Sequence, residues 1–223
     1  MFQNELTAAG ITDPELRASY EECKKLNRDH GKTYYLATLL LPSAVRPHVH
    51  ALYGFARFAD EIVDNLASTL TPQQKSDQLH RWADGVLGDI EKQRSDDPIA
   101  RALVNTISTF QIPTSYFEAF LHSMAMDLTI TEYQDFDALT EYVYGSAAVI
   151  GLQMVHVLGT LPGKKQEALV AAEKLGVAFQ LADDLIDIAS DADETGKTPG
   201  TDLREGKRTL PVLHVLDRKS TRL

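Results

Sequence analysis

The chain has little of several residue types, and each shortage excludes a class of protein. Its 223 residues include one cysteine, Cys23, which excludes an internal disulfide and fits a reducing compartment. The 32 acidic residues outnumber the 22 basic ones and give a net charge of −10, which argues against a nucleic-acid partner. The longest apolar segment, 147–158, contains glycine, glutamine and histidine and is too short to span a bilayer. The first ten residues show no secretory signal, so a cytoplasmic protein is expected.

The chain does contain repeated signals for helix starts. Asp13-Pro14, Thr71-Pro72 and Asp97-Pro98 each place a capping side chain before a proline that suits the first helical turn. Asp137 is expected to cap another helix, and Ser43 a further one. The expected helices cover 14–30, 43–66, 72–90, 98–110, 116–128, 138–158 and 164–190, with a buried apolar segment over 32–41 and a short last helix from residue 209. No strand alternation is apparent, so the sequence predicts an all-α bundle around a central cavity.

Acidic residues recur at intervals of four between Phe179 and Asp191. On an α-helix each step of four advances about 40° around the axis and about 6 Å along it, so Asp183, Asp187 and Asp191 form one row. Asp184 lies directly beside the first of them. Because like charges at this spacing repel by a few tenths of a kcal/mol, the row indicates a cation above it.

A second acidic group comprises Asp60, Glu61 and Asp64, with Arg57 three and four residues before the first two. If the two helices face each other, these carboxylates converge on one space. Oxygen ligands without cysteine suit Mg²⁺, with Mn²⁺ as an alternative, whereas the pair of histidines at 48 and 50 lacks further ligands for zinc. Mg²⁺ often shares its ligands with phosphates, so the two groups together predict a diphosphate site. The alternative is two solvated helix faces.

The segment 191–206 after the acidic row is polar and contains glycine, which predicts a loop. Lys197, Arg204, Lys207 and Arg208 provide cationic groups in and just after it, and these could close over phosphates. A solvated loop is the alternative.

From about residue 20 to residue 191 the chain resembles the squalene/phytoene synthase family. The resemblance rests on several segments that occur in the family's order: His30-Gly-Lys32-Thr-Tyr-Tyr, Tyr53-Gly-Phe-Ala-Arg57, Asp60-Glu-Ile-Val-Asp64, Met124-Ala-Met-Asp127-Leu, the run from Tyr142 to Gly151, and Phe179-Gln180-Leu. In that family two acidic motifs hold Mg²⁺ ions that grip prenyl diphosphates inside an all-α fold.

The resemblance assigns roles to residues of this chain. It implies metal ligands at Asp60, Glu61, Asp64, Asp183, Asp184, Asp187 and Asp191. It implies diphosphate contacts from His30, Lys32, Arg57 and Gln180, to which the basic loop adds Lys197, Lys207 and Arg208. Tyr53 and Tyr142 correspond to tyrosines lining the reaction cavity, and Tyr142 is the stronger candidate for handling a proton or steadying a carbocation. The alternative for each tyrosine is an ordinary core aromatic. Glu61 and Asp183 replace the family's commoner Asp and Asn, and both keep an oxygen ligand.

The resemblance implies a head-to-head condensation of two prenyl diphosphates. The first expectation is geranylgeranyl diphosphate giving phytoene through a cyclopropyl intermediate, and a squalene-like C30 product is the alternative. The segments 182–187 and 196–211 resemble polyprenyl diphosphate synthases instead, which makes head-to-tail elongation with isopentenyl diphosphate a second hypothesis. A helical diphosphate-binding protein without activity is a third.

Both families continue for several more helices beyond this chain's length. The sequence is therefore expected to form one domain over 1–217 that is incomplete at its C-terminus, with 218–223 as a non-native tail. A lipid-like substrate or product would bring such a protein into peripheral contact with a membrane.

Overall fold

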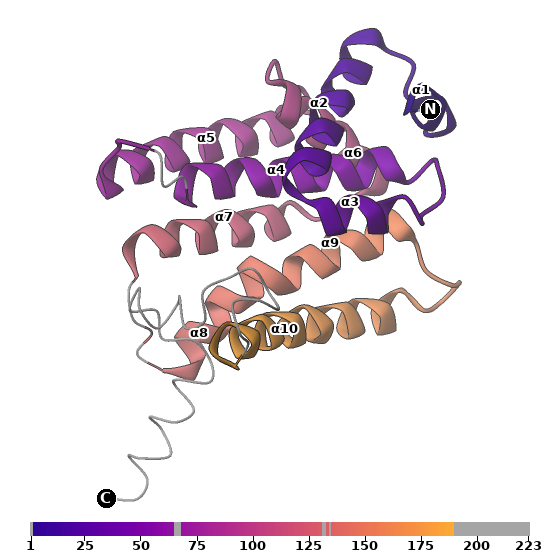
Figure 1. The fold of residues 1–223 in the computed structure, drawn as a ribbon. Coiled ribbons are helices and arrows are strands. Elements are labelled where there is room, and N and C mark those ends of the chain that lie inside the picture. The colour runs from indigo at the N-terminus through magenta and orange to yellow at the C-terminus, as the bar shows by residue number, and fades with distance from the viewer. Residues whose placement is uncertain (1, 65–67, 131–132, 134, 190–223) are drawn as a thin grey trace, which may run out of the picture.

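The computed structural model describes residues 2–64, 68–130, 133 and 135–189, and all regular structure in these ranges is helical (Figure 1). The all-α prediction is thereby confirmed. The helices are α1 (Phe2–Ala8), α2 (Pro14–His30), α3 (Lys32–Thr38), α4 (Arg46–Asp64), α5 (Pro72–Lys92), α6 (Pro98–Phe110), α7 (Thr114–Thr129), α8 (Phe136–Val143), the π-helical segment η1 (Tyr144–Ala148), α9 (Val149–Leu158) and α10 (Lys165–Ala189). No helix in the described ranges combines the length and apolar character needed to cross a membrane.

Three helices begin at the predicted proline signals. The Asp13 carboxylate accepts a hydrogen bond from the Leu16 amide at 2.8 Å, which caps α2. Asp97 caps α6 in the same way. Thr71 caps α5 through a capping box: Thr71 Oγ1 accepts from the Gln74 amide at 3.2 Å, and the Thr71 amide donates to Gln74 Oε1 at 2.9 Å.

Three expectations about local structure were wrong, and one helix was not expected. Asp135, rather than Asp137, caps α8, by accepting from the Ala138 amide at 2.9 Å. The helix expected over 138–158 is interrupted by η1, because a π turn inserts an extra residue into the ladder. Ser43 does not begin a helix, since α4 starts at Arg46. The short helix α1 was missed, because it has no proline signal at its start.

The segment 32–41 was expected to be buried, and this too was wrong. Exposure reaches 71% at Tyr34, 64% at Leu36 and 88% at Leu40. An apolar run shows that side chains avoid water, but it does not show whether a partner is present to cover them. In this part of the molecule α3 packs mainly on α2.

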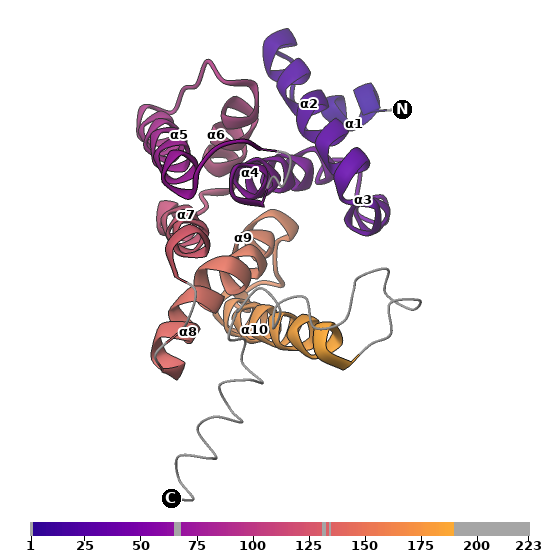
Figure 2. The same cartoon turned by 60° about the vertical axis from the view of Figure 1, so that its left-hand side comes forward.

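The main core joins α4, α5, α6, α7 and α9, and α2 packs across α4 and α6 (Figure 2). Phe55 on α4 lies at its centre, with its ring 5.4 Å from that of Phe117 and 5.5 Å from that of Trp82. The α9–η1 segment then carries α10 on its other side. This arrangement fixes α4 in the middle of the upper part of the bundle in Figure 1 and α10 along its lower side.

The two histidines of α4 belong to this packing. His48 Nδ1 lies 3.1 Å from the Tyr20 hydroxyl and 3.0 Å from Thr106 Oγ1, and His50 Nδ1 accepts from Asn27 Nδ2 at 2.9 Å. Burial lowers the pKa of both imidazoles to about 4, so both are neutral at pH 7. Their contacts assign them to the interior between helices and not to a metal site.

Replacing Glu5 with glutamine is expected to destabilise the fold by about 1–3 kcal/mol at pH 7. Glu5 is buried and accepts from Lys24 Nζ at 3.1 Å and from Arg46 Nη1 at 2.8 Å. Burial raises its pKa, but the bonds to these two cations outweigh burial and hold the pKa below its usual 4.5. The stabilisation is therefore complete above pH 4.5 and is lost as the pH falls through the folded pKa. Urea unfolding at pH 7 and pH 3 measures this, and an equal difference between the two proteins at both pH values would contradict it.

Candidate active site

The acidic group of α4 is organised by one arginine. Arg57 Nη1 donates to Asp60 Oδ2 at 2.9 Å, and Arg57 Nη2 donates to Glu61 Oε2. These pairs form because residues three and four apart lie on the same side of a helix. Asp64, one turn further on, is exposed at the end of the helix. The structure thus brings together the predicted residues of this group.

This group carries an excess of negative charge, because it contains three carboxylates and one guanidinium. Burial raises the pKa of the Asp60 carboxyl, and the charge of Asp64 raises it further, while Arg57 acts in the opposite direction. A cation bound here would stabilise the ionised form of the Asp60 carboxyl, which the surrounding charges disfavour. The donor set therefore fits a hard divalent cation such as Mg²⁺, with Asp60 and Asp64 as the ligands not fully satisfied by Arg57.

The start of α3 lies against the beginning of this group. Gly31 packs on Tyr53 so closely that an added Cβ would lie 2.6 Å from Tyr53 Cζ. Tyr53 is one turn before Arg57, and the nearby charges of Arg57 and Asp60 both act on its pKa, which burial raises. The exposed side chains of His30 and Lys32 flank Gly31. The segment with His30 and Lys32 and the segment with Arg57 are distant in the sequence, but both lie near Tyr53. Both were predicted to contact a diphosphate.

The second acidic group lies on α10, and close helix packing positions this helix. An added Cβ at Gly151 would lie 2.8 Å from the Ala172 carbonyl oxygen, and one at Gly176 would lie 2.7 Å from Ala148 Cα. These glycines let α10 approach α9 and η1 closely. The half-buried Gln180 follows one turn after Gly176.

Most side chains of the second acidic group lie outside the described part of the structure. Asp183, Asp184 and Asp187 lie in the last turns of α10, but their side chains are outside the described part of the structure. The remaining predicted residues, Asp191, Lys197, Arg204, Lys207 and Arg208, lie outside the described residues altogether. Within the described ranges no three acidic, histidine or cysteine side chains are grouped closely enough to hold a metal ion. The convergence of the two acidic groups stays a prediction.

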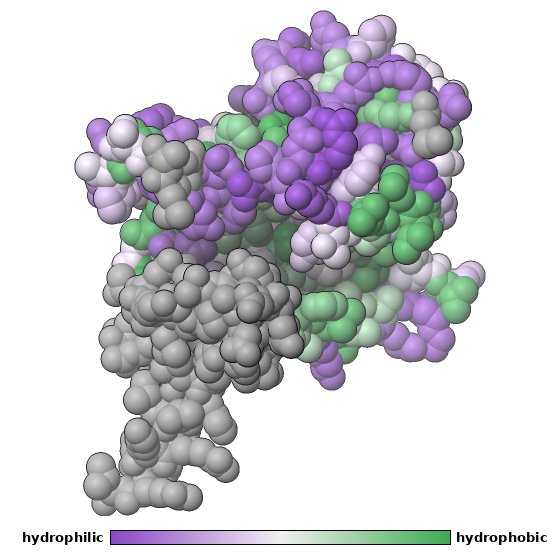
Figure 3. Space-filling view, in the orientation of Figure 1, coloured by the Kyte–Doolittle hydropathy of each residue, from purple (hydrophilic) through white to green (hydrophobic). Residues whose placement is uncertain are grey.

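The directions of the helices are compatible with that prediction. In Figure 1 α4 and α10 both run from right to left, so their C-terminal ends lie on the same side of the molecule. Figure 3 shows apolar residues in the hollow between the part that contains α4 and the part that contains α10. An apolar space between two helices whose acidic ends share one side suits a substrate with an apolar chain and a charged head.

Tyr142 belongs to a separate group at the end of α8. Its ring lies 5.4 Å from that of Tyr133, and its backbone carbonyl accepts from Ser123 Oγ at 3.0 Å. Burial raises the pKa of its hydroxyl, and the charge of Asp127 raises this pKa further. Sequence reasoning gave no role to Ser123, Asp127 or Tyr133. The four-residue spacing of the first two on α7 was the available signal.

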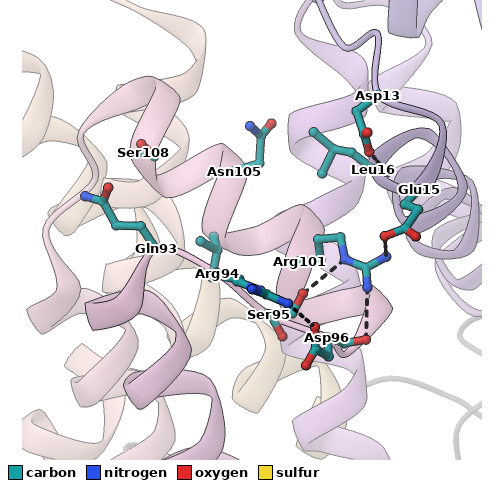
Figure 4. Close-up of a pocket in the computed structure, with 11 residues that line it drawn as sticks. Asp13, Glu15, Leu16, Gln93, Arg94, Ser95, Asp96, Arg101, Asn105 and Ser108 are labelled. Carbon is teal, nitrogen blue, oxygen red and sulfur yellow. Dashed lines mark hydrogen bonds and ion pairs between the residues drawn. The ribbon is translucent and has the colours of Figure 1, made fainter.

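A further pocket lies elsewhere, between the start of α2, the α5–α6 loop and α6 (Figure 4). It encloses about 460 Å³ and is lined mainly by polar and charged side chains. Arg101 Nε donates to the Ser95 carbonyl at 3.0 Å and Nη2 to the Asp96 carbonyl at 3.1 Å, while Nη1 lies 3.7 Å from Glu15. These contacts tie the loop to α2, so the pocket is explained by helix packing.

Comparison with known proteins identifies the family. The squalene/phytoene synthase family matches residues 27–206, a range that contains the α4 group, Tyr142 and α10. The chain belongs to the squalene/phytoene synthase family. A chloroplastic phytoene synthase of Daucus carota is 36% identical over 181 residues, which are 79% of this chain and 44% of the relative. The 15-cis-phytoene synthase of Synechocystis sp. is 32% identical over 200 residues, 87% of this chain and 56% of the relative.

Two solved structures with a similar fold are named as a squalene synthase and a dehydrosqualene synthase. A squalene synthase from Alicyclobacillus acidocaldarius superposes with a TM-score of 0.70 at 24% identity, covering 96% of this chain and 82% of that one. A dehydrosqualene synthase gives a TM-score of 0.67 at 23% identity, covering 93% and 75%. These likenesses establish the fold. The chain spans about half the length of the curated relatives it matches.

Replacing Arg57 with glutamine is expected to move the acid limb of the pH–rate profile to higher pH. The charge and hydrogen bond of Arg57 lower the pKa of Asp60, so their loss raises it, and Asp60 must be ionised to bind a cation. The measurement is kcat/KM against pH at saturating Mg²⁺. The variant Arg81→Gln, at an exposed arginine on α5, is the control. An acid limb at the same pH in Arg57→Gln and the wild type would show that Arg57 does not tune Asp60.

Proposed function

We propose that this family member catalyses the Mg²⁺-dependent head-to-head condensation of two prenyl diphosphates. The observation that carries the proposal is the α4 group, in which Arg57 bridges Asp60 and Glu61, and Asp64 lies exposed one turn further on. Family membership supports a prenyltransferase reaction for such a group. Because this chain spans only part of its relatives, the activity and its substrates are proposed rather than transferred.

In this proposal the polar residues handle the diphosphates. Asp60, Glu61 and Asp64, with Asp183, Asp184, Asp187 and Asp191, would hold Mg²⁺, which supplies positive charge that promotes departure of the diphosphate. His30, Lys32, Arg57 and Gln180 bind its oxygens, and Lys197, Lys207 and Arg208 add charge from the loop. Tyr53 and Tyr142 line the space for the prenyl chains. The apolar side chains in the hollow would disfavour water, which would otherwise trap an allylic cation.

Geranylgeranyl diphosphate is the proposed substrate, and a C40 hydrocarbon of the phytoene type is the proposed product. The curated relatives named as phytoene synthases support this choice. Two C20 units join with loss of two diphosphates and two protons, so the reaction needs no reductant. Peripheral contact with a membrane by a cytoplasmic protein is part of the proposal, because the product is an apolar hydrocarbon and α3 exposes Tyr34 and Leu36.

Separate incubations with geranylgeranyl and farnesyl diphosphate test the substrate. With Mg²⁺ and no reductant, we expect the C40 hydrocarbon from the first to form at least about tenfold faster than any C30 hydrocarbon from the second. Removal of Mg²⁺ by a chelator is expected to stop the reaction and its return to restore it. Faster formation of the C30 product would show that the substrate assignment is wrong, and activity that survives the chelator would contradict the metal requirement.

A further inference from the structure

The turn between α2 and α3 carries two of the residues predicted to contact a diphosphate. His30 ends α2, Lys32 begins α3, and Gly31 between them is buried. The Gly31 amide donates to the Asn27 carbonyl at 2.8 Å, which closes α2, and the Gly31 carbonyl accepts from the Tyr35 amide at 2.7 Å, which opens α3. The direction in which His30 and Lys32 leave this turn therefore depends on the backbone from Asn27 to Tyr35.

One histidine of α4 contacts this backbone on both sides of the turn. Before the turn, Asn27 Nδ2 donates to His50 Nδ1 at 2.9 Å. After the turn, the Tyr35 ring stacks on the His50 imidazole, with the ring centroids 5.8 Å apart and 23° between the ring planes. Burial lowers the pKa of His50 to about 4, so the imidazole is neutral at pH 7 and its Nδ1 can accept a proton donor. His50 thus joins the end of α2 to the start of α3.

The same face of α4 leads to the acidic group. Tyr53 follows His50 by three residues and Arg57 follows Tyr53 by four, so the three side chains lie along one side of the helix. Gly31 packs directly on Tyr53, because an added Cβ would lie 2.7 Å from the Tyr53 hydroxyl oxygen. The Tyr34 ring lies 6.3 Å from the Tyr53 ring. The position of the α2–α3 turn relative to Arg57 is therefore set by its contacts with His50 and Tyr53.

The pairing of Asn27 with His50 is not what packing alone would select. Both residues are fully buried. Within the part of the chain that the structure describes, Asn27 Oδ1 and His50 Nε2 have no hydrogen-bond partner. Unpaired polar atoms in a core cost stability, and two apolar side chains of similar shape would avoid this cost. A hydrogen bond is directional, whereas an apolar contact is not, so the pair supplies orientation rather than stability.

We propose that Asn27 and His50 are positioning residues that fix the α2–α3 turn against α4 and so hold His30 and Lys32 where they can bind a diphosphate. The inference deepens the proposed function and rests on it for the diphosphate contact, but the fixing of the turn is a property of the free protein. Asn27 and His50 act through the turn, since both are buried while His30 and Lys32 are exposed.

The fixing of the turn is measured without substrate, by hydrogen exchange of the Gly31 and Tyr35 amides. Asn27→Leu keeps a similar side-chain shape and removes the hydrogen bond to His50, and it is expected to speed exchange of both amides at least about tenfold. Thr106→Val is the matched control, because it removes a buried hydroxyl that lies 3.0 Å from Nδ1 of His48, the other histidine of α4. Unchanged exchange in Asn27→Leu, or equal acceleration in both variants, would overturn the inference.

The effect on binding is measured by calorimetry with inorganic diphosphate and Mg²⁺. Asn27→Leu is expected to raise the Kd about tenfold, and Thr106→Val to change it less than about twofold. In the background His30→Gln/Lys32→Gln, Asn27→Leu is expected to add less than about twofold, because the residues through which it acts are gone. A tenfold loss in that background as well would overturn the assignment of Asn27 to the positioning of His30 and Lys32.

A double variant separates positioning from stability. Asn27→Leu/His50→Phe keeps a ring beside Tyr35 and removes both unpaired polar atoms, so its Tm is expected to be no more than about 3 °C below that of the wild type. Its Kd for inorganic diphosphate is expected to stay about tenfold higher. Binding restored together with stability would show that the pair only stabilises the fold. A wild-type chain that binds no diphosphate would contradict the proposed function, and hydrogen exchange would still decide whether the pair fixes the turn.

Discussion

Replacing Asp64 with alanine is expected to lower turnover at least about a hundredfold while leaving the helical content unchanged. Asp64 is exposed at the end of α4, so its removal leaves no cavity in the core. It is also the carboxylate of the group for which no arginine contact is seen in the described structure. If a cation binds there, the loss of Asp64 removes a ligand and part of the charge that attracts the metal.

A matched variant separates this effect from a general loss of negative charge. Asp77 is an exposed aspartate on α5 that accepts from Gln73 Nε2 at 2.9 Å. Asp77→Ala is expected to keep turnover within about twofold of the wild type. Steady-state rates with Mg²⁺ and circular dichroism of both variants make the comparison. Full turnover in Asp64→Ala would remove Asp64 from the metal site, and a similar loss in both variants would show a non-specific charge effect.

Replacing Gly145 with alanine is expected to destabilise the fold by about 3 kcal/mol. The added Cβ would collide with Ser123 Oγ and with the backbone carbonyl of Ala119, and a backbone atom cannot move without shifting the whole turn of α7. The free energy of unfolding by urea measures the effect.

The opposite sign is expected for another glycine in a helix. Gly85 lies inside α5, is exposed, and has nothing within 4 Å of an added Cβ. Gly85→Ala is therefore expected to stabilise the fold by about 0.5–1 kcal/mol, because alanine loses less conformational freedom in a helix. Equal effects of the two substitutions would show that close packing at Gly145 does not matter to stability.

Local sequence signals predicted most of the helix starts. Asp13, Thr71 and Asp97 each cap the helix that follows them, because capping depends only on residues within one turn. The α4 group was predictable for the same reason, since its ion pairs join residues three and four apart. Burial was less predictable, as the exposed Leu40 shows, because burial depends on elements far away in the sequence.

The contacts around Tyr142 show what sequence reasoning could not supply. Ser123 and the Tyr142 carbonyl that accepts its hydrogen bond are on different helices, and their meeting depends on how α8 packs on α7. The π segment that accompanies this contact has no reliable sequence signal, although Gly145 within it marks a close approach. The acidic row of α10 was predicted from the four-residue spacing of its aspartates. The predicted convergence of this row with the α4 group is supported by the shared direction of the two helices.

The product formed with and without isopentenyl diphosphate tests the central claim most directly. The protein is incubated with Mg²⁺ and geranylgeranyl diphosphate, and the organic and aqueous products are identified by mass. Head-to-head condensation predicts a neutral C40 hydrocarbon from the allylic substrate alone, with two diphosphates released for each hydrocarbon and no dependence on isopentenyl diphosphate. A longer prenyl diphosphate that forms only when isopentenyl diphosphate is present would contradict the account and assign the chain to head-to-tail elongation.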